Sequence, residues 1–189
     1  GARIKLPTIT AKDRKDIKEG LKLGVDFIAL SFVRSDKDVQ ELFSLLKRVK
    51  NKPEIFAKIE DQQGMDSIEV ITKHSDGLLV ARGDLGIETD ITNLPYVQRK
   101  MVKVALQSGK KCIVATQLLE SMVTNPHPTR AEVSDVANAV YEGADALMLS
   151  AETTIGDFPL KCVKYLSDIA KNAERSETLH FENNMKSVS

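Results

Sequence analysis

The alternation of two hydrophobic periodicities constrains the fold of this chain more than any other feature. Short apolar runs typical of strands alternate with longer stretches in which apolar residues recur every three or four positions, as along one helix face. The apolar runs are residues 27–33, 54–59, 77–81, 111–115 and 146–149. No hairpin turn joins consecutive runs, so the strands are expected to be parallel and connected by helices. The sequence therefore predicts an α/β protein of parallel βα units with about five strands.

Local signals locate the helices between these runs. Two Thr-x-x-acid patterns resemble capping boxes, which open helices. These patterns are Thr10 with Asp13 and Thr129 with Glu132. A helix is expected over residues 11–23, a short helix over 117–123 and a last helix from Pro159. The polar composition beyond that helix predicts a domain over residues 1–177 and a polar tail over 178–189.

Each predicted strand ends in a polar residue. These residues are Ser31, Lys58, Arg82, Thr116 and Ser150. The carboxyl ends of parallel strands share one edge, and the sites of (β/α)₈ barrels and of open α/β sheets lie at that edge. One polar strand end can simply mark the point where a strand reaches water. Five in series, two of them close to carboxylates, favour a functional site.

Two of these strand ends have the chemistry of an anion and metal site. In the first, Arg82-Gly83-Asp84 follows a buried run, which suits a tight turn into a helix whose backbone N–H groups attract anions. Asp84 could hold a hard cation such as Mg²⁺ in the same turn. In the second, the strand period of 2 places Lys58 and Glu60 on one face. We therefore expect the two stretches to form one site. The 27–33 run is expected to be a strand buried on both faces.

Composition excludes several classes of protein. The 189 residues are 42% hydrophobic, and the 27 basic side chains equal the 27 acidic ones, so neither nucleic acid nor an anionic membrane is expected as a partner. No apolar run approaches the roughly 20 residues of a membrane span. The first residues lack the apolar region of a signal peptide, and Cys112 and Cys162 read as buried, reduced thiols. The expected location is the cytoplasm.

Six stretches resemble the pyruvate kinase family, in order and at its spacing. They are residues 57–60, 80–86, 115–122, 128–132, 134–140 and 149–153. The resemblance implies part of a TIM-type (β/α)₈ barrel, namely its fourth to eighth strands. The first three strands, the lid, the regulatory domain and the ligands of the K⁺ ion are expected to lie outside this chain. It also implies a homo-oligomer, a tetramer in the family, with Arg130, Glu132 and Asp135 near subunit contacts or simply on a capped, solvated helix.

The resemblance assigns roles to the residues that would bind the metal ion and the reacting substrate. Glu60 and Asp84 are similar to the family's Mg²⁺ ligands, and Lys58 to its transition-state stabiliser. An alternative for Lys58 is an ion pair with Glu60 or Asp61, which could coexist with catalysis. Gly83 and Asp84 would offer backbone N–H groups to the substrate carboxylate.

Three further strand-end residues have less specific roles. Thr116 resembles the family's substrate-contacting threonine, on the side where enolpyruvate is protonated. Ser150 would belong to a proton relay there or be structural. Arg82 would form a structural ion pair or contact the substrate.

The resemblance implies a transferase of glycolysis that passes a phosphoryl group from phosphoenolpyruvate to ADP, giving pyruvate and ATP. One alternative is an inactive or partner-dependent remnant of the barrel. Another is a lyase of the phosphoenolpyruvate/pyruvate superfamily, which residues 116–122 argue against. A polypeptide of these residues alone is expected to have weak or no activity.

Overall fold

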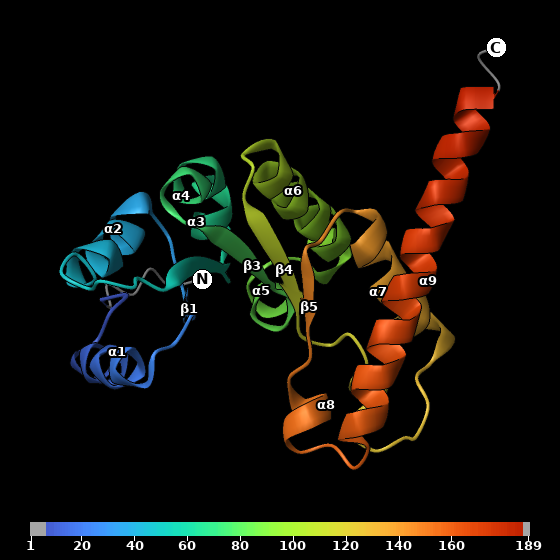
Figure 1. Ribbon diagram of the computed structural model, residues 1–189, viewed down its shortest axis with the longest axis horizontal. Helices are drawn as coiled ribbons and strands as arrows, with labels where there is room; N and C mark the ends of the chain where they lie inside the picture. Colours follow the sequence, from blue (N-terminus) through green and yellow to red (C-terminus); the bar gives the residue numbers. More distant parts are fainter. Residues whose placement is uncertain (1–6, 187–189) are drawn as a thin grey trace. The chain divides into compact units, whose positions relative to one another are not determined.

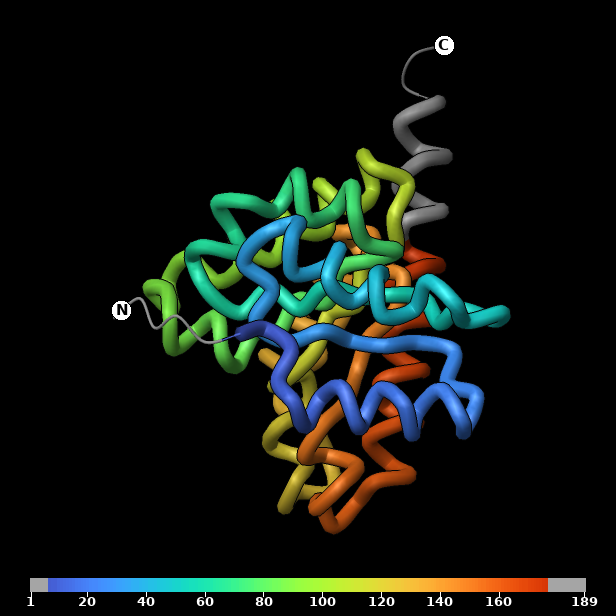
Figure 2. Tube along the Cα trace, turned by 90° about the vertical axis from the view of Figure 1, so that its left-hand side faces the viewer, coloured from blue at the N-terminus to red at the C-terminus, as the bar shows by residue number. Residues whose placement is uncertain are grey.

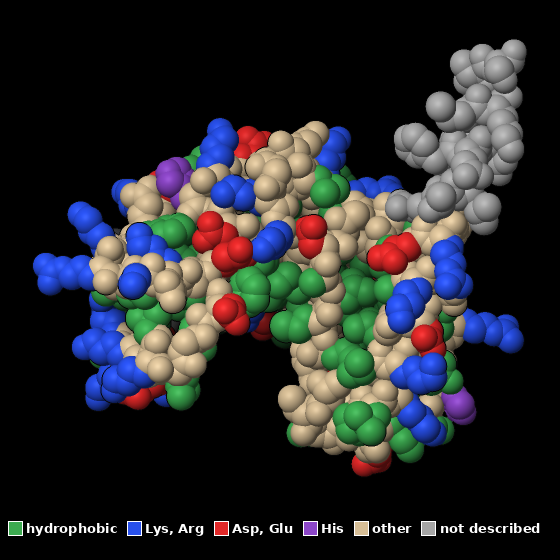
Figure 3. All heavy atoms as spheres, in the orientation of Figure 1, with side chains coloured by type: hydrophobic (Ala, Val, Ile, Leu, Met, Phe, Trp, Pro, Cys, Tyr) green, Lys and Arg blue, Asp and Glu red, His purple; other side chains and the backbone are tan. Residues whose placement is uncertain are grey.

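The computed structural model describes residues 7–186, and the side chains of residues 7–176 (Figure 1). The chain divides after Cys112 into two compact units, Gly1–Cys112 and Ile113–Ser189. Among the described residues, no helix is long and apolar enough to cross a lipid bilayer. The face drawn in Figure 3 carries basic, acidic and apolar side chains, in keeping with the balanced composition.

Unit 1 is built on three parallel strands that follow one another in chain order, β1, β2 and β3 (Figure 1). Its elements are α1 (Ala11–Leu23), β1 (Phe27–Leu30), α2 (Asp36–Leu45), β2 (Glu54–Ile59), α3 (Gln62–Asp66), α4 (Ile68–His74), β3 (Gly77–Ala81), α5 (Arg82–Glu88), η1 (Ile91–Asn93) and α6 (Leu94–Gln107). Helix α4 packs against both α2 and α6, and α6 also packs on β3. The bounds predicted for the second and third strands are confirmed.

The core of unit 1 lies around β2 and β3. All five residues of β3 are buried, and Ile55, Ala57 and Ile59 of β2 are completely so. Strands buried on both faces are typical of parallel sheets whose faces are covered by helices. The rigid centre of unit 1 therefore ends at Ile59 and Ala81, where the predicted site begins.

The prediction for residues 27–33 is wrong in length and in burial. Strand β1 ends at Leu30, Phe27 is 57% exposed and Ala29 is exposed as well. Phe32 has a φ of 53°, a left-handed conformation that ends an extended strand. Within the described part of unit 1, β1 pairs with β2 alone, so its other edge is uncovered.

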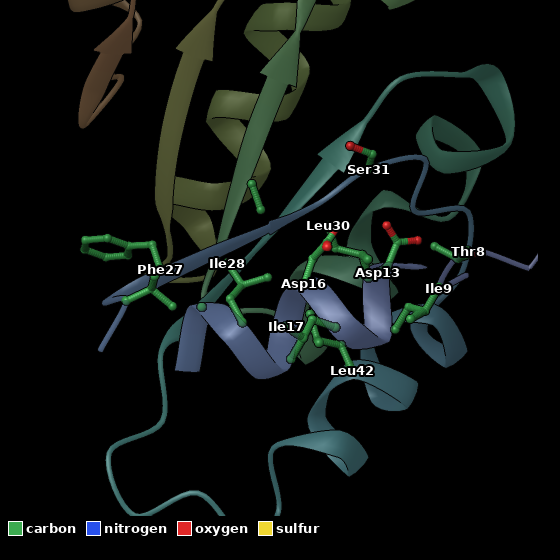
Figure 4. Close-up of a pocket in the computed structure, with 13 residues that line it drawn as sticks. Thr8, Ile9, Asp13, Asp16, Ile17, Phe27, Ile28, Leu30, Ser31 and Leu42 are labelled. Atoms are coloured by element: carbon green, nitrogen blue, oxygen red, sulfur yellow. The ribbon is translucent and has the colours of Figure 1, made fainter. Parts of the chain in front are cut away.

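Helix α1 has the predicted bounds and the predicted capping box, and Gly24 ends it at a φ of 73°. It runs beside β1 but buries none of its residues (Figure 2). A pocket of about 320 Å³ opens between α1 and β1, with Ile17, Ile28 and Leu42 among its walls (Figure 4). The packing of α1 on unit 1 is therefore loose.

Strand β4 (Lys111–Ala115) begins in unit 1 and ends in unit 2, where it pairs in parallel with β5 (Ala146–Met148). The other elements of unit 2 are η2 (Glu120–Val123), α7 (Arg130–Tyr141), α8 (Ala151–Thr154) and α9 (Pro159–Lys186). Helices α7 and α9 pack side by side (Figure 1). Cys112 and Cys162 are buried free thiols, as predicted.

Three predictions for unit 2 have different outcomes. The short helix predicted over 117–123 is only the 3₁₀ turn η2, and α8 was not predicted. Helix α9 continues past the predicted tail boundary to Lys186, and residues 187–189 lie outside the described part of the chain. The domain limits 1–177 and 178–189 stay a prediction.

Candidate functional site

The end of β2 carries a buried ion pair. Glu60 is 1% exposed, and its Oε1 lies 2.7 Å from Nζ of Lys58. Its Oε2 accepts a hydrogen bond of 2.5 Å from the backbone N–H of Phe32. The Lys58 ammonium also donates to Oγ of Ser31, at 3.0 Å. Because both oxygens of Glu60 and two donors of Lys58 are engaged, the two side chains hold each other in fixed positions.

The predicted ion pair of Lys58 is therefore confirmed with Glu60. The neighbouring Asp61 has other partners, Nε of Arg34 at 2.6 Å and the backbone N–H of Gly64, through which it caps α3. Side chains alternate between the two faces along β2, so Lys58 and Glu60 point to one face and the next residue, Asp61, to the other. One carboxylate serves the site and the next serves the helix that follows.

The glycine-rich stretch after β3 starts a helix, as predicted. Strand β3 ends at Ala81 and α5 begins at Arg82, so Gly83 and Asp84 lie in its first turn. Arg82 is 6% exposed and donates from its guanidinium to Oε1 of Gln98 at 3.3 Å. Its burial favours the structural alternative over substrate contact. Asp84 is exposed.

Strand register brings the two predicted metal ligands to the same edge. Ile59 of β2 pairs with Val80 of β3, so Glu60 is level with Ala81 and Asp84 follows three residues later. Carboxylate oxygens are the ligands that Mg²⁺ prefers, and its sites often have one or two carboxylates, with water and phosphate oxygens completing the octahedron. Among the described residues, no group of three or more His, Cys, Asp and Glu is placed to hold a metal. Glu60 and Asp84 have the ligand chemistry that Mg²⁺ prefers, and the shared Mg²⁺ site stays a prediction.

Unit 2 carries the other two predicted site residues at the ends of paired strands. Ala115 of β4 pairs with Met148 of β5, so Thr116 and Ser150 both follow the carboxyl ends of neighbouring strands. Thr116 and Gln117 have φ values of 70° and 53°. A left-handed β-branched residue is a steric outlier that costs of order 1–3 kcal/mol, and such strain clusters at functional sites. Oγ1 of Thr116 lies 2.6 Å from the carbonyl oxygen of Ala115.

One buried acid in unit 2 was missed by the sequence reasoning. Glu152 is completely buried, and its carboxylate accepts hydrogen bonds from the N–H groups of Leu119, at 3.2 Å, and Ser150, at 2.8 Å. Glu152 lies in one of the six stretches that resemble the family. That stretch, and its position two residues after a polar strand end, were the signals that could have identified it.

A second acid, Glu132, holds the same segment. It completes the predicted capping box with Thr129 and also accepts hydrogen bonds from the N–H and Oγ of Ser121. Burial opposes its ionisation, but the hydrogen bonds from Ser121 and Thr129 outweigh burial and lower the pKa of Glu132. Burial and then the nearby Glu152 carboxylate raise the pKa of the Cys162 thiol, which makes this cysteine unreactive.

Comparison with known proteins connects this geometry to one family. The family model described as "Pyruvate kinase, barrel domain" matches residues 1–163. The pyruvate kinase of Methanocaldococcus jannaschii is 47% identical over 180 residues, covering 95% of this chain and 39% of that protein. Those of Staphylococcus aureus (strain MRSA252) and Clostridium perfringens are 50% and 49% identical, over 94% and 90% of this chain and 30% and 36% of theirs.

The chain thus spans about a third of the length of the curated relatives it matches. The match to a barrel-domain model, together with the parallel βα units, confirms the predicted partial (β/α)₈ barrel. The resemblance stated from six short stretches is confirmed over most of the chain.

Proposed function

Because this chain belongs to the pyruvate kinase family, we propose that it supplies part of a site that transfers a phosphoryl group from phosphoenolpyruvate to ADP, giving pyruvate and ATP. The observation that carries the proposal is the buried Lys58–Glu60 pair, beside the turn that holds Asp84. This arrangement combines a fixed cation, two carboxylates at one edge and backbone N–H groups in the first turn of α5. Phosphoryl transfer needs positioned charges of this kind more than it needs covalent chemistry.

Lys58 stabilises the charge that develops during transfer. Its ammonium has three N–H donors, of which Glu60 and Ser31 take two, and its side chain is 23% exposed. The remaining donor can reach a phosphoryl or enolate oxygen from the solvent side. An ammonium fixed before the reaction costs no reorganisation, which is how preorganised donors lower a barrier.

Glu60 and Asp84 would hold Mg²⁺, one of the two metals, with K⁺, that the family uses. When bound, Mg²⁺ supplies positive charge to the phosphoryl oxygens and to the substrate. The chain's own contribution is the spacing of two carboxylates across β2 and α5. Lys58 holds the buried carboxylate of Glu60 in place through the 2.7 Å ion pair.

Gly83 and Asp84 would bind the substrate carboxylate through their backbone N–H groups, since glycine permits close backbone approach. Thr116 would contact the substrate where enolpyruvate is protonated, and Ser150 would belong to the proton relay. The partners are phosphoenolpyruvate or pyruvate and ADP or ATP. A homo-oligomer in the cytoplasm is the setting that family membership supports.

A second candidate is a chain that needs another polypeptide to act. It is favoured by the uncovered edge of β1 and by α1, which buries no residue. Such a chain would hold Lys58, Glu60 and Asp84 in place without completing the substrate site.

The test combines turnover with metal binding by the purified 189-residue chain. Pyruvate formation is followed with lactate dehydrogenase, and Mn²⁺ binding is followed by electron paramagnetic resonance as a probe of the Mg²⁺ site. Lys58→Met is expected to abolish turnover, and Glu60→Gln or Asp84→Asn to weaken Mn²⁺ binding about tenfold or more. Glu54→Gln, at the other end of β2, is the matched control, because Glu54 forms only an exposed pair with Lys111.

Turnover that survives Lys58→Met would contradict the proposal. A Mn²⁺ affinity that neither Glu60→Gln nor Asp84→Asn changes would also contradict it. Mn²⁺ binding without turnover in the unsubstituted chain would favour the partner-dependent candidate.

A further inference from the structure

Glu152 joins two segments that are distant in sequence. Its Oε1 accepts from the N–H of Leu119, 33 residues earlier in the chain, and its Oε2 accepts from the N–H of Ser150. The side chain is completely buried, as is that of Leu119. A buried carboxylate bound by two backbone amides is held in one position, because leaving either amide unbonded would be costly.

Local capping explains only half of this arrangement. Ser150 is the N-cap of the four-residue helix α8, so its bond to Glu152 helps to start that helix. The bond to Leu119 adds nothing to α8. It instead fastens the segment that leaves β4, three residues after Thr116.

The segment fastened in this way starts with a strained turn. Thr116 and Gln117 are both left-handed, and neither is a glycine. Such a conformation persists only where surrounding contacts impose it. Glu152 holds the segment at Leu119, and Glu132 holds it again at Ser121. Gly156 in turn lies so close to Glu152 that an added Cβ would come within 2.5 Å of the Glu152 carbonyl oxygen.

We propose that Glu152 is a positioning residue, which fixes the segment carrying Thr116 against the segment carrying Ser150. The inference rests on the proposed function for its chemical meaning. In that reaction, enolpyruvate becomes pyruvate when a proton forms the new C3–H bond and the enolate electron pair forms the C2 carbonyl. Thr116 and Ser150 lie on the side of this proton transfer, whereas Lys58 serves phosphoryl transfer.

The first measurement is amide hydrogen exchange in the 189-residue chain, followed by nuclear magnetic resonance. In Glu152→Gln the amide keeps the length of the side chain, but its NH₂ group cannot accept the second N–H. Exchange at Leu119 and Ser150 is expected to accelerate about tenfold or more. Glu120→Gln is the matched control, because Glu120 is an exposed carboxylate next to Leu119 and its loss is expected to leave Leu119 and Ser150 within about twofold.

The second measurement separates positioning from general stability. Exchange of the pyruvate methyl hydrogens with D₂O in the presence of Mg²⁺ reports proton transfer at C3 without phosphoryl transfer. Glu152→Gln is expected to slow this exchange about tenfold, with the KM for phosphoenolpyruvate changed less than about twofold. If Glu152→Gln does not fold, Glu152→Asp is measured in its place. The aspartate keeps the charge and is expected to lose the bond to Leu119.

Unchanged amide exchange in Glu152→Gln would overturn the inference. Loosened amides without slower methyl exchange, or with an equal loss of substrate binding, would overturn it as well. If the unsubstituted chain exchanges no pyruvate hydrogens, it does not act alone, which favours the partner-dependent candidate. Amide exchange alone then tests the inference. A loss of protection confined to Leu119 and Ser150 would support it.

Discussion

At the scale of single residues, Lys58 has a structural role and a proposed chemical role that can be separated. Glu60 is 1% exposed, and the partners of its carboxylate are Lys58 and the backbone N–H of Phe32. Breaking a buried pair by removing one partner costs far more than the pair is worth as a whole. The lysine therefore stabilises the fold even where no substrate is bound.

Lys58→Met is expected to lower the free energy of unfolding by about 3 kcal/mol, because Glu60 loses its counter-charge. Adding Glu60→Gln is expected to recover part of that loss, since the double variant has no uncompensated charge. Urea denaturation followed by circular dichroism, arranged as a double-mutant cycle, measures both effects. The exposed Glu54–Lys111 pair is the reference, and Glu54→Gln is expected to cost less than about 1 kcal/mol. Equal costs for the two sites would contradict the prediction.

At the scale of elements, the close approach between β2 and β3 depends on Gly77. An added Cβ at Gly77 would lie 2.4 Å from the Phe56 ring and 2.8 Å from the Lys111 carbonyl oxygen. The Phe56 ring is buried and packs edge-on against Phe27 of β1, and the Lys111 carbonyl is backbone, so neither can yield cheaply. The glycine is therefore needed for space rather than for a special backbone conformation.

Gly77→Ala is expected to destabilise the chain by about 2 kcal/mol, through overpacking beside β2. Gly20→Ala in α1 is the matched control, because its Cβ would meet only Val25, at an ordinary 3.6 Å. There the helix propensity of alanine is expected to add about 0.5–1 kcal/mol. Thermal unfolding of both variants checks the prediction, which fails if the two changes have the same sign.

The lowered pKa of Glu132 makes the start of α7 sensitive to acid. A carboxyl group whose pKa is lower in the folded state than its ordinary value of 4.5 stabilises the fold above that value. This contribution is lost as the pH falls through the lowered, folded-state pKa. Unfolding free energies measured between about pH 7 and pH 3 are expected to fall less steeply for Glu132→Gln than for the unsubstituted chain. Parallel curves below pH 4.5 would show that Glu132 has no part in the acid response.

Sequence patterns predicted the elements whose signals are local. The bounds of β2, β3 and β4 and of helix α1 agree with the prediction, because apolar runs and capping residues act within a few positions. The prediction that the 27–33 run is buried on both faces was wrong because β1 lies at the edge of the strands described in unit 1, where half of its residues face outward. Apolar composition alone does not distinguish an edge strand from a central one.

In the candidate site too, the features with local sequence signals were the predictable ones. Lys58 and Glu60 share a face by strand period, and their pairing is one of the two that the sequence left open. The bonds of Glu152 to Leu119 and of Phe32 to Glu60 could not be predicted, since each depends on how distant loops fold. The left-handed turn at Thr116 contains no glycine or asparagine, the residues that usually indicate such a conformation in a sequence.

At the scale of the whole molecule, the described residues leave some packing surfaces of unit 1 uncovered. Ala29 is exposed on β1, α1 buries no residue and a pocket of about 320 Å³ separates the two. A phosphoryl-transfer site needs walls that exclude water, and those surfaces would have to be covered by further polypeptide. The chemistry of the site and its enclosure are therefore separate requirements.

A polypeptide of only these 189 residues is expected to form pyruvate weakly or not at all. Mixing it with the part of the Methanocaldococcus jannaschii relative that this chain does not match is expected to raise turnover about tenfold or more, if that part covers β1 and α1. Ala29→Lys on β1 is expected to reduce this gain, whereas Leu160→Lys, at an exposed position on α9, is not. The lactate dehydrogenase assay measures turnover, and sedimentation measures association. Strong turnover by the unmixed chain would show that the residues described here already enclose the reaction, and equal effects of the two lysine variants would show that β1 is not where the added portion binds.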